Sequence, residues 1–291
     1  MKTYLECIPC FLNQALRAMD LTKQNPKIKR EVITKIMRIL SKSKLDKNPP
    51  EYAKIVYNLI EKETGNFDSY KTIKKRDNQN ALKLLPNLRK IIKNSREPLL
   101  IAMKIAIAGN IMDFAAHPNY DVKETIKKVI KQNFAIDNYN TFKKDIQKSK
   151  SIVYIGDNAG EIILDRLLIE QIREINKNKI YFFVKGKPIL NDATIEDAKK
   201  AGIDKISNVE IRKISTGFPN IGIERGSKEF ISFLKNQDII ISKGQGNYES
   251  LSEIKANIYF LLIAKCSVIA RDLGVKTGQV ICKKNNQTNK K

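Results

Sequence analysis

The sequence has no tryptophan, and its 291 residues include one histidine and four cysteines. The histidine, His117, stands beside a proline in a predicted loop. Without a second histidine the chain lacks the residues for a His-rich metal site, and this isolated position argues against a histidine-based catalytic triad. Four cysteines are too few for a disulfide scaffold in a chain of this length, so we expect a reducing compartment.

Long apolar runs are also missing. The longest stretches, such as IYFFV and YFLLIA, are far shorter than the ~20 residues that a membrane-spanning helix needs. The first ten residues, MKTYLECIPC, contain a glutamate and two cysteines, unlike a signal peptide. With 42% hydrophobic and 29% charged residues, the composition is that of a globular protein. We therefore expect a cytoplasmic protein without a membrane partner.

The net charge of +23 raises the question of nucleic-acid binding. The excess is mostly lysine, with 43 Lys against 11 Arg, whereas base recognition favours arginine and single-strand binding favours stacked aromatic rings. Aromatic residues make up only 7% of the chain. A solvated lysine-rich surface is the preferred interpretation. A non-catalytic α/β protein that captures a nucleotide or RNA remains the alternative.

Residues 1–148 have a helical pattern. Apolar residues recur every three or four positions, as in EVITKIMRILSK and EYAKIVYNLIEKET, and PLLIAMKIAIAGNIMDF is apolar on most sides, as in a buried helix. Helix-breaking stretches separate such segments, namely NPK, KNPPE, TGNF, LPN and HPN. The pattern predicts an all-helical N-terminal domain over residues 1–148.

From residue 149 the apolar pattern becomes that of strands. Short β-rich runs, SIVYIGD, KIYFFVKG, NVEIRKIS and DIIISKG, recur roughly every thirty residues and alternate with helical patterns. This spacing predicts a mostly parallel sheet with helices on both faces, a three-layer α/β domain, over residues 149–283. Residues 284–291 are predicted to be a disordered tail. Ligands of such sheets bind beyond the carboxyl ends of the strands.

Polar residues follow three of the predicted strands. They are Asp157, Asn158 and Glu161 after the first, Lys185, Asn191 and Asp192 after the second, and Lys243, Asn247 and Glu249 after the last. Carboxylate and amide oxygens are suited to a hard divalent cation, and lysines offset the charge of an anionic substrate. We therefore expect these residues to meet in one crevice that holds a metal ion and an anionic ligand.

Other interpretations of the first junction, GDNAGE, remain open. It could be a degenerate dinucleotide-binding loop, although G-x-G-x-x-G is absent and an acid would repel a pyrophosphate. Asp157 and Asn158 could be plain helix caps, and an aspartate could also act as the nucleophile of a phosphatase. No phosphate-binding P-loop sequence, G-x-x-x-x-G-K-[ST], occurs in the chain.

Three further motifs are candidates. In KGQGNYE, Gly244 and Gly246 would let the backbone approach a ligand closely. In GNIMDF, Asn110 and Asp113 lie in the middle or at the end of an otherwise apolar helix and need a polar partner, either at a buried helix end or in the crevice. Cys7 and Cys10 form a C-x-x-C pair that could serve an accessory metal or redox role, with Cys266 and Cys282 as further metal ligands.

The segments ECIPCF, GNIMDF, GDNAGEIILD, KGKPILNDAT, KGQGNYE and KCSVIARDLGV occur in this order from Cys7 to about Val280. Together they resemble the damage-control metal-dependent phosphatases, once catalogued as domain of unknown function 89. The C-x-x-C near the start is similar to that of the archaeal and bacterial subfamily. The resemblance implies a helical part packed on a Rossmann-like domain.

The resemblance also implies roles for individual residues. The metal ligands of the family correspond to Asp157, Asn158 and Asp192, and an asparagine of its substrate loop corresponds to Asn247. Glu249 stands where other subfamilies have an arginine, so the sugar-phosphate preference of some relatives does not carry over. The family has also been linked to carboxyl methylation, which makes a SAM-dependent carboxyl methyltransferase a further alternative. No SAM-binding glycine loop stands out here.

The leading hypothesis is a divalent-metal-dependent phosphatase that hydrolyses a small phosphorylated metabolite. Its metal ion, Mn²⁺, Ni²⁺, Co²⁺ or Mg²⁺, would lie on Asp157, Asn158 and Asp192. The residues predicted to be catalytic are Asp157, Asn158, Lys243 and Glu161. Those predicted to bind substrate are Asn110, Lys185, Gly244, Gly246, Asn247 and Glu249. The sequence does not decide whether water or Asp157 attacks, and it predicts no oligomeric state.

Overall fold

The structure is a computed structural model that describes residues 1–110, 122–214 and 228–285. These residues form twelve α-helices and seven strands. The helices are α1 (Cys7–Leu21), α2 (Pro26–Ser41), α3 (Pro49–Thr64), α4 (Lys71–Lys93), α5 (Pro98–Gly109), α6 (Val122–Lys131), α7 (Tyr139–Lys148), α8 (Glu161–Ile175), α9 (Ile195–Lys200), α10 (Lys228–Lys235), α11 (Gln245–Leu251) and α12 (Ser267–Leu273). The strands are β1 (Ile136–Asp137), β2 (Ile152–Ile155), β3 (Ile180–Lys185), β4 (Val209–Ile214), β5 (Ile239–Lys243), β6 (Ile258–Ile263) and β7 (Val280–Lys284).

The strands form one sheet in the order β1-β7-β6-β5-β2-β3-β4. Neighbouring strands are parallel except for the antiparallel pair β6 and β7. The four strands predicted from the sequence are β2, β3, β4 and β5. From β2 the chain builds β3 and β4 on one side and then crosses to β5 on the other, so a crevice is expected where β2 and β5 end side by side.

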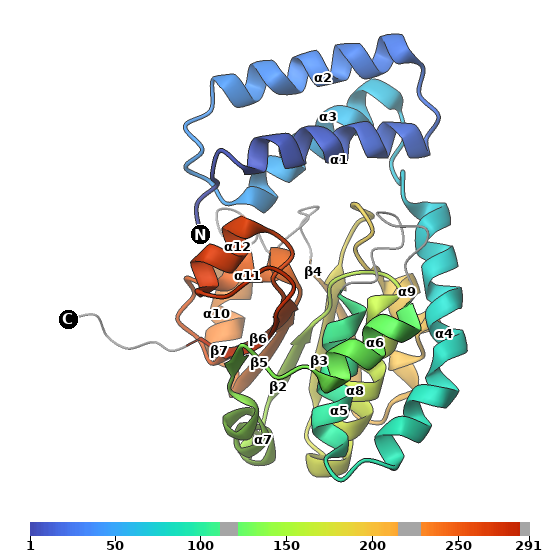
Figure 1. Cartoon of the computed structure of the whole chain (residues 1–291), viewed down its shortest axis with the longest axis vertical. Coiled ribbons are helices and arrows are strands. Elements are labelled where there is room, and N and C mark those ends of the chain that lie inside the picture. Colours follow the sequence, from blue (N-terminus) through green and yellow to red (C-terminus); the bar gives the residue numbers. More distant parts are fainter. Residues whose placement is uncertain (111–121, 215–227, 286–291) are drawn as a thin grey trace, which may run out of the picture.

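Helices cover both faces of the sheet (Figure 1). One face packs on a large apolar cluster that draws residues from α4 to α9, including Ile105, Phe142 and Leu168. The other face packs on a second cluster with residues from α10, α11 and α12, including Leu234, Leu251 and Ile269. These layers confirm the predicted fold class of a three-layer, mostly parallel α/β sheet carrying a helical N-terminal part.

Helices α1, α2 and α3 form a separate lobe with its own apolar core, which includes Phe11, Ile36 and Val56. In Figure 1 this lobe, drawn in blue, lies across the end of the sheet where α11 and α12 begin. Helix α3 starts with a capping box in which Asn48 and Glu51 each satisfy a backbone N–H of the other, and two prolines occupy its first turn. These features fix the first turn of α3, which lies over the carboxyl ends of the strands.

The prediction that LPN would end a helix is wrong, because Pro86 lies inside α4. A proline in a helix removes one backbone hydrogen bond. Pro86 has no N–H to donate to the carbonyl of Leu82 one turn earlier. Both residues are exposed, so this carbonyl can bind water instead. The opposite face of α4, with Ala81, Leu85 and Leu88, is buried in the core, and this packing outweighs the local cost.

The predicted domain boundaries at 1–148, 149–283 and 284–291 remain a prediction. Helix α5 packs closely on α8, and β1 joins the same sheet through β7 before residue 149 is reached. Helix α5 is buried as expected but ends at Gly109, and Asp113 and His117 lie outside the described residues. Lys284 is the last residue of β7, and residues 286–291 are not described.

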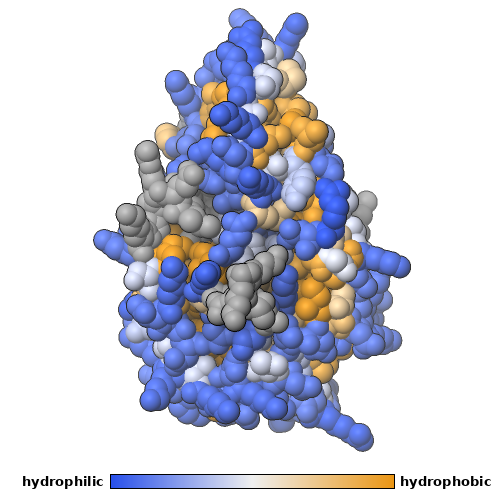
Figure 2. Space-filling view, turned by 90° about the vertical axis from the view of Figure 1, so that its left-hand side faces the viewer, coloured by the Kyte–Doolittle hydropathy of each residue, from blue (hydrophilic) through white to orange (hydrophobic). Residues whose placement is uncertain are grey.

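The surface agrees with the lysine-rich composition. Figure 2 shows hydrophilic residues over most of the visible face, with long side chains projecting from it. Within the described ranges, no helix combines the length and the apolar character that a membrane span requires.

Candidate active site

The first part of the site is the junction between β2 and α8. Asp157 and Asn158 follow this strand, and the loop after β3 returns to pair with them. The Ala193 N–H donates to the carbonyl of Asp157 at 2.8 Å, and Asn158 forms an isolated antiparallel bridge with Asp192. This backbone pairing brings Asp192 next to Asp157, although the two residues are separated by a helix and a strand in the chain.

The three predicted metal ligands, Asp157, Asn158 and Asp192, line one cavity of about 390 Å³. Its other walls come from the start of α1, the start of α3, the loop and first turns of α11, and the start of α12. The cavity therefore lies between the carboxyl ends of the strands and the lobe of α1, α2 and α3. Gly246 and Glu249, both predicted to bind substrate, also line it.

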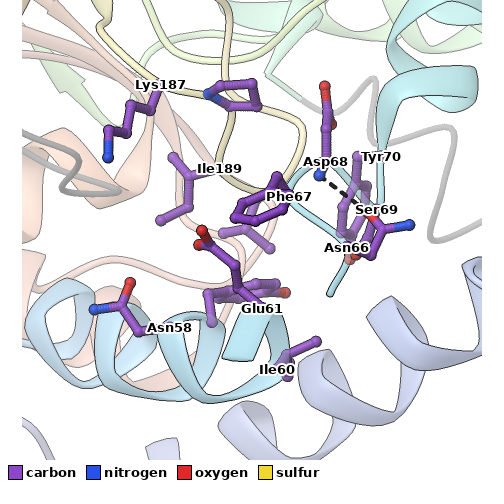
Figure 3. A pocket seen from close by; sticks show the side chains of 13 residues that line it. Asn58, Ile60, Glu61, Asn66, Phe67, Asp68, Ser69, Tyr70, Lys187 and Ile189 are labelled. Carbon is purple, nitrogen blue, oxygen red and sulfur yellow. Dashed lines mark hydrogen bonds between the residues drawn. The ribbon is translucent and has the colours of Figure 1, made fainter. Parts of the chain in front are cut away.

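Two other cavities are not lined by Asp157, Asn158 or Asp192. One of about 80 Å³ lies among α3, the connection from α3 to α4, and the loop after β3. Figure 3 shows Glu61, Phe67 and Ile189 around it. Another of about 550 Å³ is lined by six lysines, namely Lys71, Lys74, Lys75, Lys185, Lys200 and Lys213. The carboxylates and amides that the sequence singled out favour the 390 Å³ cavity as the active site.

The carboxyl groups of this site are held in an environment that opposes their ionisation. Burial, followed by repulsion from Glu161, raises the pKa of Asp157 to about 6. Burial raises the pKa of Asp192 to about 8, with Asp157 adding to the effect and Lys185 opposing it. Both carboxyls are therefore crowded and desolvated, a setting in which a bound cation would favour their charged forms.

Unpaired oxygens point to the same conclusion. Oδ2 of Asp192 and Oδ1 of Asn110 are buried without a hydrogen bond to any described residue. The nearest cation to Asp192 is Nζ of Lys185, 3.7 Å from Oδ2. Buried acceptors without partners are costly. The donor set of two aspartates and the Asn158 amide oxygen therefore fits a hard divalent ion.

Two amide groups orient the carboxylates. Nδ2 of Asn158 donates to Oδ2 of Asp157 at 2.9 Å and to Oε2 of Glu161 at 3.0 Å. Nδ2 of Asn110, at the end of α5, donates to the same two atoms at 3.1 and 3.2 Å. Because the Asn158 amide nitrogen is used inside the site, only its oxygen could serve as a metal ligand. Asn110 thus holds Asp157 and Glu161 from the helical part but does not line the cavity, and its predicted contact with substrate stays a prediction.

Lys243 lies beneath the site and is fully buried. Its Nζ donates to Oε1 of Glu161 at 2.7 Å, to Oδ1 of Asp165 at 2.6 Å and to the carbonyl of Ala106 at 2.8 Å. An ammonium group has three donors, and all are used here. The structure does not place Lys243 against the cavity, so the predicted contact with a phosphoryl group is absent in this arrangement. Lys243 positions Glu161 instead.

Lys185 and Asn247 also lie behind the cavity wall. Nδ2 of Asn247 donates to the carbonyls of Gly156 and Lys243 at 3.2 and 2.7 Å, which ties the ends of β2 and β5 together. Its Oδ1 is 3.5 Å from Nζ of Lys185. Lys185 lines the lysine-rich cavity and not the acidic one. Their predicted roles in substrate binding remain untested.

Gly244 allows a close approach of the backbone to Asp157, whereas the predicted close approach to a ligand stays a prediction. Its φ of +81° lies in the left-handed region, and a Cβ added here would be 1.9 Å from Oδ2 of Asp157. We expect Gly244→Ala to displace Asp157 and to lower kcat/KM of the reaction catalysed at this site by about 10²-fold, since small misplacements of reacting groups have effects of this size. Steady-state kinetics would measure it.

The matched control is Gly278→Ala, at a glycine with φ of +86° and no atom within 4 Å of the added Cβ. It carries similar backbone strain far from any close contact. If both variants kept normal activity, close packing of Gly244 against Asp157 would be unimportant for the site.

The two cysteines of the C-x-x-C pair open the first turns of α1, and both line the acidic cavity together with Cys266. All are free thiols, and burial raises the pKa of both Cys7 and Cys10. Cys282 is buried in β7 and does not line the cavity. Within the described ranges, no group of three or more His, Cys, Asp or Glu side chains is placed to hold a metal. The accessory metal or redox role stays a prediction.

Over residues 3–281, the chain matches the family described as the damage-control phosphatase ARMT1-like domain. The chain belongs to this family. A damage-control phosphatase from Pyrococcus horikoshii is 36% identical over 290 residues, covering 98% of this chain and 99% of that protein. One from Archaeoglobus fulgidus is 30% identical over 289 residues, with coverage of 97% and 99%. A crystal structure of a DUF89 family protein from P. horikoshii superimposes with a TM-score of 0.88 at 33% identity, covering 98% and 100% of the two chains.

These similarities confirm the family resemblance and the prediction of a phosphatase of the damage-control class. The ARMT1-like family also implies a divalent metal, without specifying the ion or its ligands. The sequence interpretation missed Asp165, although an acid four residues after Glu161, within the apolar run that opens the helix, was a visible signal. It also missed Asn78 of α4, whose Oδ1 accepts from the Gly160 N–H at 2.7 Å. Nothing in the local sequence of α4 reveals that contact.

Proposed function

We propose that this protein is a divalent-metal-dependent phosphatase that hydrolyses a small phosphorylated metabolite, and that Asp157, Asn158 and Asp192 hold the ion. The observation that carries this proposal is the buried, unpaired Oδ2 of Asp192 in the same cavity as Asp157. The closest cation to these two desolvated carboxyls is Nζ of Lys185, 3.7 Å from Oδ2 of Asp192, which is beyond hydrogen-bond distance. A divalent ion bound between the carboxyls would compensate their charge more fully.

Mn²⁺, Ni²⁺, Co²⁺ and Mg²⁺ all accept such oxygen ligands. When bound, the ion would polarise a phosphoryl oxygen and offset negative charge on the transferring group. A cavity of about 390 Å³ suits a small metabolite and is too small for a large ligand.

The side chains of the site have a division of tasks in this proposal. Asn110 and Asn158 hold the carboxylates of Asp157 and Glu161 in fixed directions, so little reorganisation is needed when substrate binds. Lys243 fixes Glu161 from below. Either a water molecule oriented by Glu161 or the carboxylate of Asp157 itself attacks phosphorus.

Metal binding should stabilise the folded protein, because the unfolded chain has no preformed site. At a concentration 100-fold above its Kd, an ion adds about 2.7 kcal/mol to the free energy of unfolding. We expect Mn²⁺ to raise Tm by roughly 5–10 °C in the wild type and to have no effect on Asp192→Asn. Differential scanning fluorimetry with and without the ion measures both values.

Asp204→Asn, which changes an exposed aspartate, is the control and should respond like the wild type. EDTA should also abolish turnover of p-nitrophenyl phosphate, and Mn²⁺, Co²⁺ or Ni²⁺ should restore it. An unchanged metal-induced rise of Tm in Asp192→Asn would remove Asp192 from the ligand set.

The alternatives make different predictions. A nucleotide- or RNA-binding protein would show binding whose log K falls by about 0.7–0.9 per phosphate contact with log salt, which a gel shift at two salt concentrations detects. A SAM-dependent carboxyl methyltransferase would be stabilised by SAM and indifferent to EDTA.

A further inference from the structure

Glu249 of α11 is an acidic side chain in the active-site cavity for which the proposed function has no task. Its side chain is 8% exposed. It lines the same cavity as Asp157, Asn158 and Asp192, one turn after the Gly244 loop that touches Asp157. A carboxylate is an unexpected group on the wall of a cavity that has to receive a dianionic phosphate ester.

The surroundings of Glu249 leave one oxygen available to a ligand. Nε2 of Gln245 donates to Oε1 at 3.0 Å, which sets the direction of the carboxyl group. Oε2 makes no hydrogen bond to the residues that the structure describes, and no lysine or arginine among them pairs with the group. The backbone carbonyl of Glu249, and not its side chain, accepts from the N-terminal ammonium at 3.1 Å.

We propose that Glu249 is the general acid of this phosphatase and that it delivers a proton to the ester oxygen of the leaving alcohol. The proposal rests on the proposed function. As the P–O bond breaks, the proton moves from Oε2 to the bridging oxygen, and the leaving group departs as a neutral alcohol. One water molecule is consumed overall, and it returns a proton to Glu249 through solvent.

The electrostatics of the cavity support this role. Burial raises the pKa of Glu249 to about 7, with smaller contributions from Asp157 and Asp272. The Gln245 amide and the N-terminal ammonium act in the opposite direction. Cys7 and Cys10 of α1 are also close to Glu249: after burial, the charge of Glu249 contributes to raising the pKa of both thiols. An acid that stays protonated near neutral pH and faces the cavity can donate a proton to the leaving group.

The test compares two substrates in the metal-loaded enzyme. The p-nitrophenolate ion leaves readily without a proton, whereas the alkoxide of glycerol 3-phosphate needs one. We expect Glu249→Gln to lower kcat/KM for glycerol 3-phosphate by about 10²-fold or more and to change that for p-nitrophenyl phosphate by less than about threefold. Gln keeps the acceptor for Gln245. Glu174→Gln, at an exposed glutamate near the end of α8, is the control and should leave both values unchanged.

The pH profile gives a readout that a structural role would not move. General acid catalysis requires the protonated form, so wild-type turnover of glycerol 3-phosphate should fall as pH rises through the Glu249 pKa. This decrease should be missing in Glu249→Gln and retained in Glu249→Asp, which serves as a second variant if the first does not fold. Equal losses with both substrates, or an unchanged decrease at high pH, would overturn the proposal. If the wild type hydrolysed neither substrate with any of the four ions, the proposed function itself would be wrong.

Discussion

Replacing Asp157 by alanine is expected to lower phosphatase kcat/KM by about 10³-fold or more. The side chain lies between the amides of Asn110 and Asn158 and is a proposed metal ligand, so its loss removes both the ion and the fixed geometry around it. A bound metal supplies several kcal/mol to a phosphoryl-transfer transition state, and each ~1.4 kcal/mol corresponds to a factor of ten in rate. Steady-state kinetics with p-nitrophenyl phosphate would measure the loss.

The fold should survive this change, because Asp157 follows a strand and makes no apolar contact in the core clusters. Removing one of several crowded carboxylates also relieves repulsion, so Tm without metal should be unchanged or slightly higher. Asp157→Asn should show the same kinetic loss with an isosteric side chain. Full metal-stimulated turnover in either variant would show that Asp157 is not part of the catalytic machinery.

Replacing Lys243 by methionine is expected to have the largest effect on stability, a loss of about 3–5 kcal/mol in the free energy of unfolding. The ammonium group is fully buried between Glu161 and Asp165. Methionine fills a similar volume but leaves two desolvated carboxyl groups without a cation. This cost is typical of breaking a buried ion pair by removing one partner.

Urea unfolding followed by circular dichroism would measure this loss. Lys235→Met, at an exposed lysine in α10, is the control and should change stability by less than about 0.5 kcal/mol. A triple variant, with Lys243→Met, Glu161→Gln and Asp165→Asn, should recover part of the stability because no buried charge remains. If Lys243→Met alone were as stable as the wild type, the internal ion pairs would be too weak to position Glu161.

Much of the α/β architecture could be predicted from local pattern. The runs that became β2, β3, β4 and β5 are short and apolar, and helical patterns follow them, which is typical of parallel strands buried on both faces. The course of α4 through Pro86 was not predicted. A proline is a strong local signal, and only packing of the opposite helix face shows that it is tolerated.

The sequence by itself determined the chemistry available to this protein: carboxylates and amides at strand ends, glycines beside them, and no histidine pair. Parallel strands all run in the same direction, so their carboxyl ends lie at one edge of the sheet, where ligands bind. An acid that directly follows such a strand is therefore placed at that edge. This is why Asp157, Asn158 and Asp192 could be expected in one crevice, whereas their assignment as metal ligands came from the family resemblance.

Tertiary structure alone decided which polar residues face the cavity. Lys243 and Glu249 are six residues apart and equally polar, but the former lies at the end of a strand buried on both faces and the latter on the side of a helix that borders the cavity. A sequence records spacing along one chain. The direction of a side chain depends on what packs against it from other segments, in this case α5, α8 and the lobe of α1, α2 and α3.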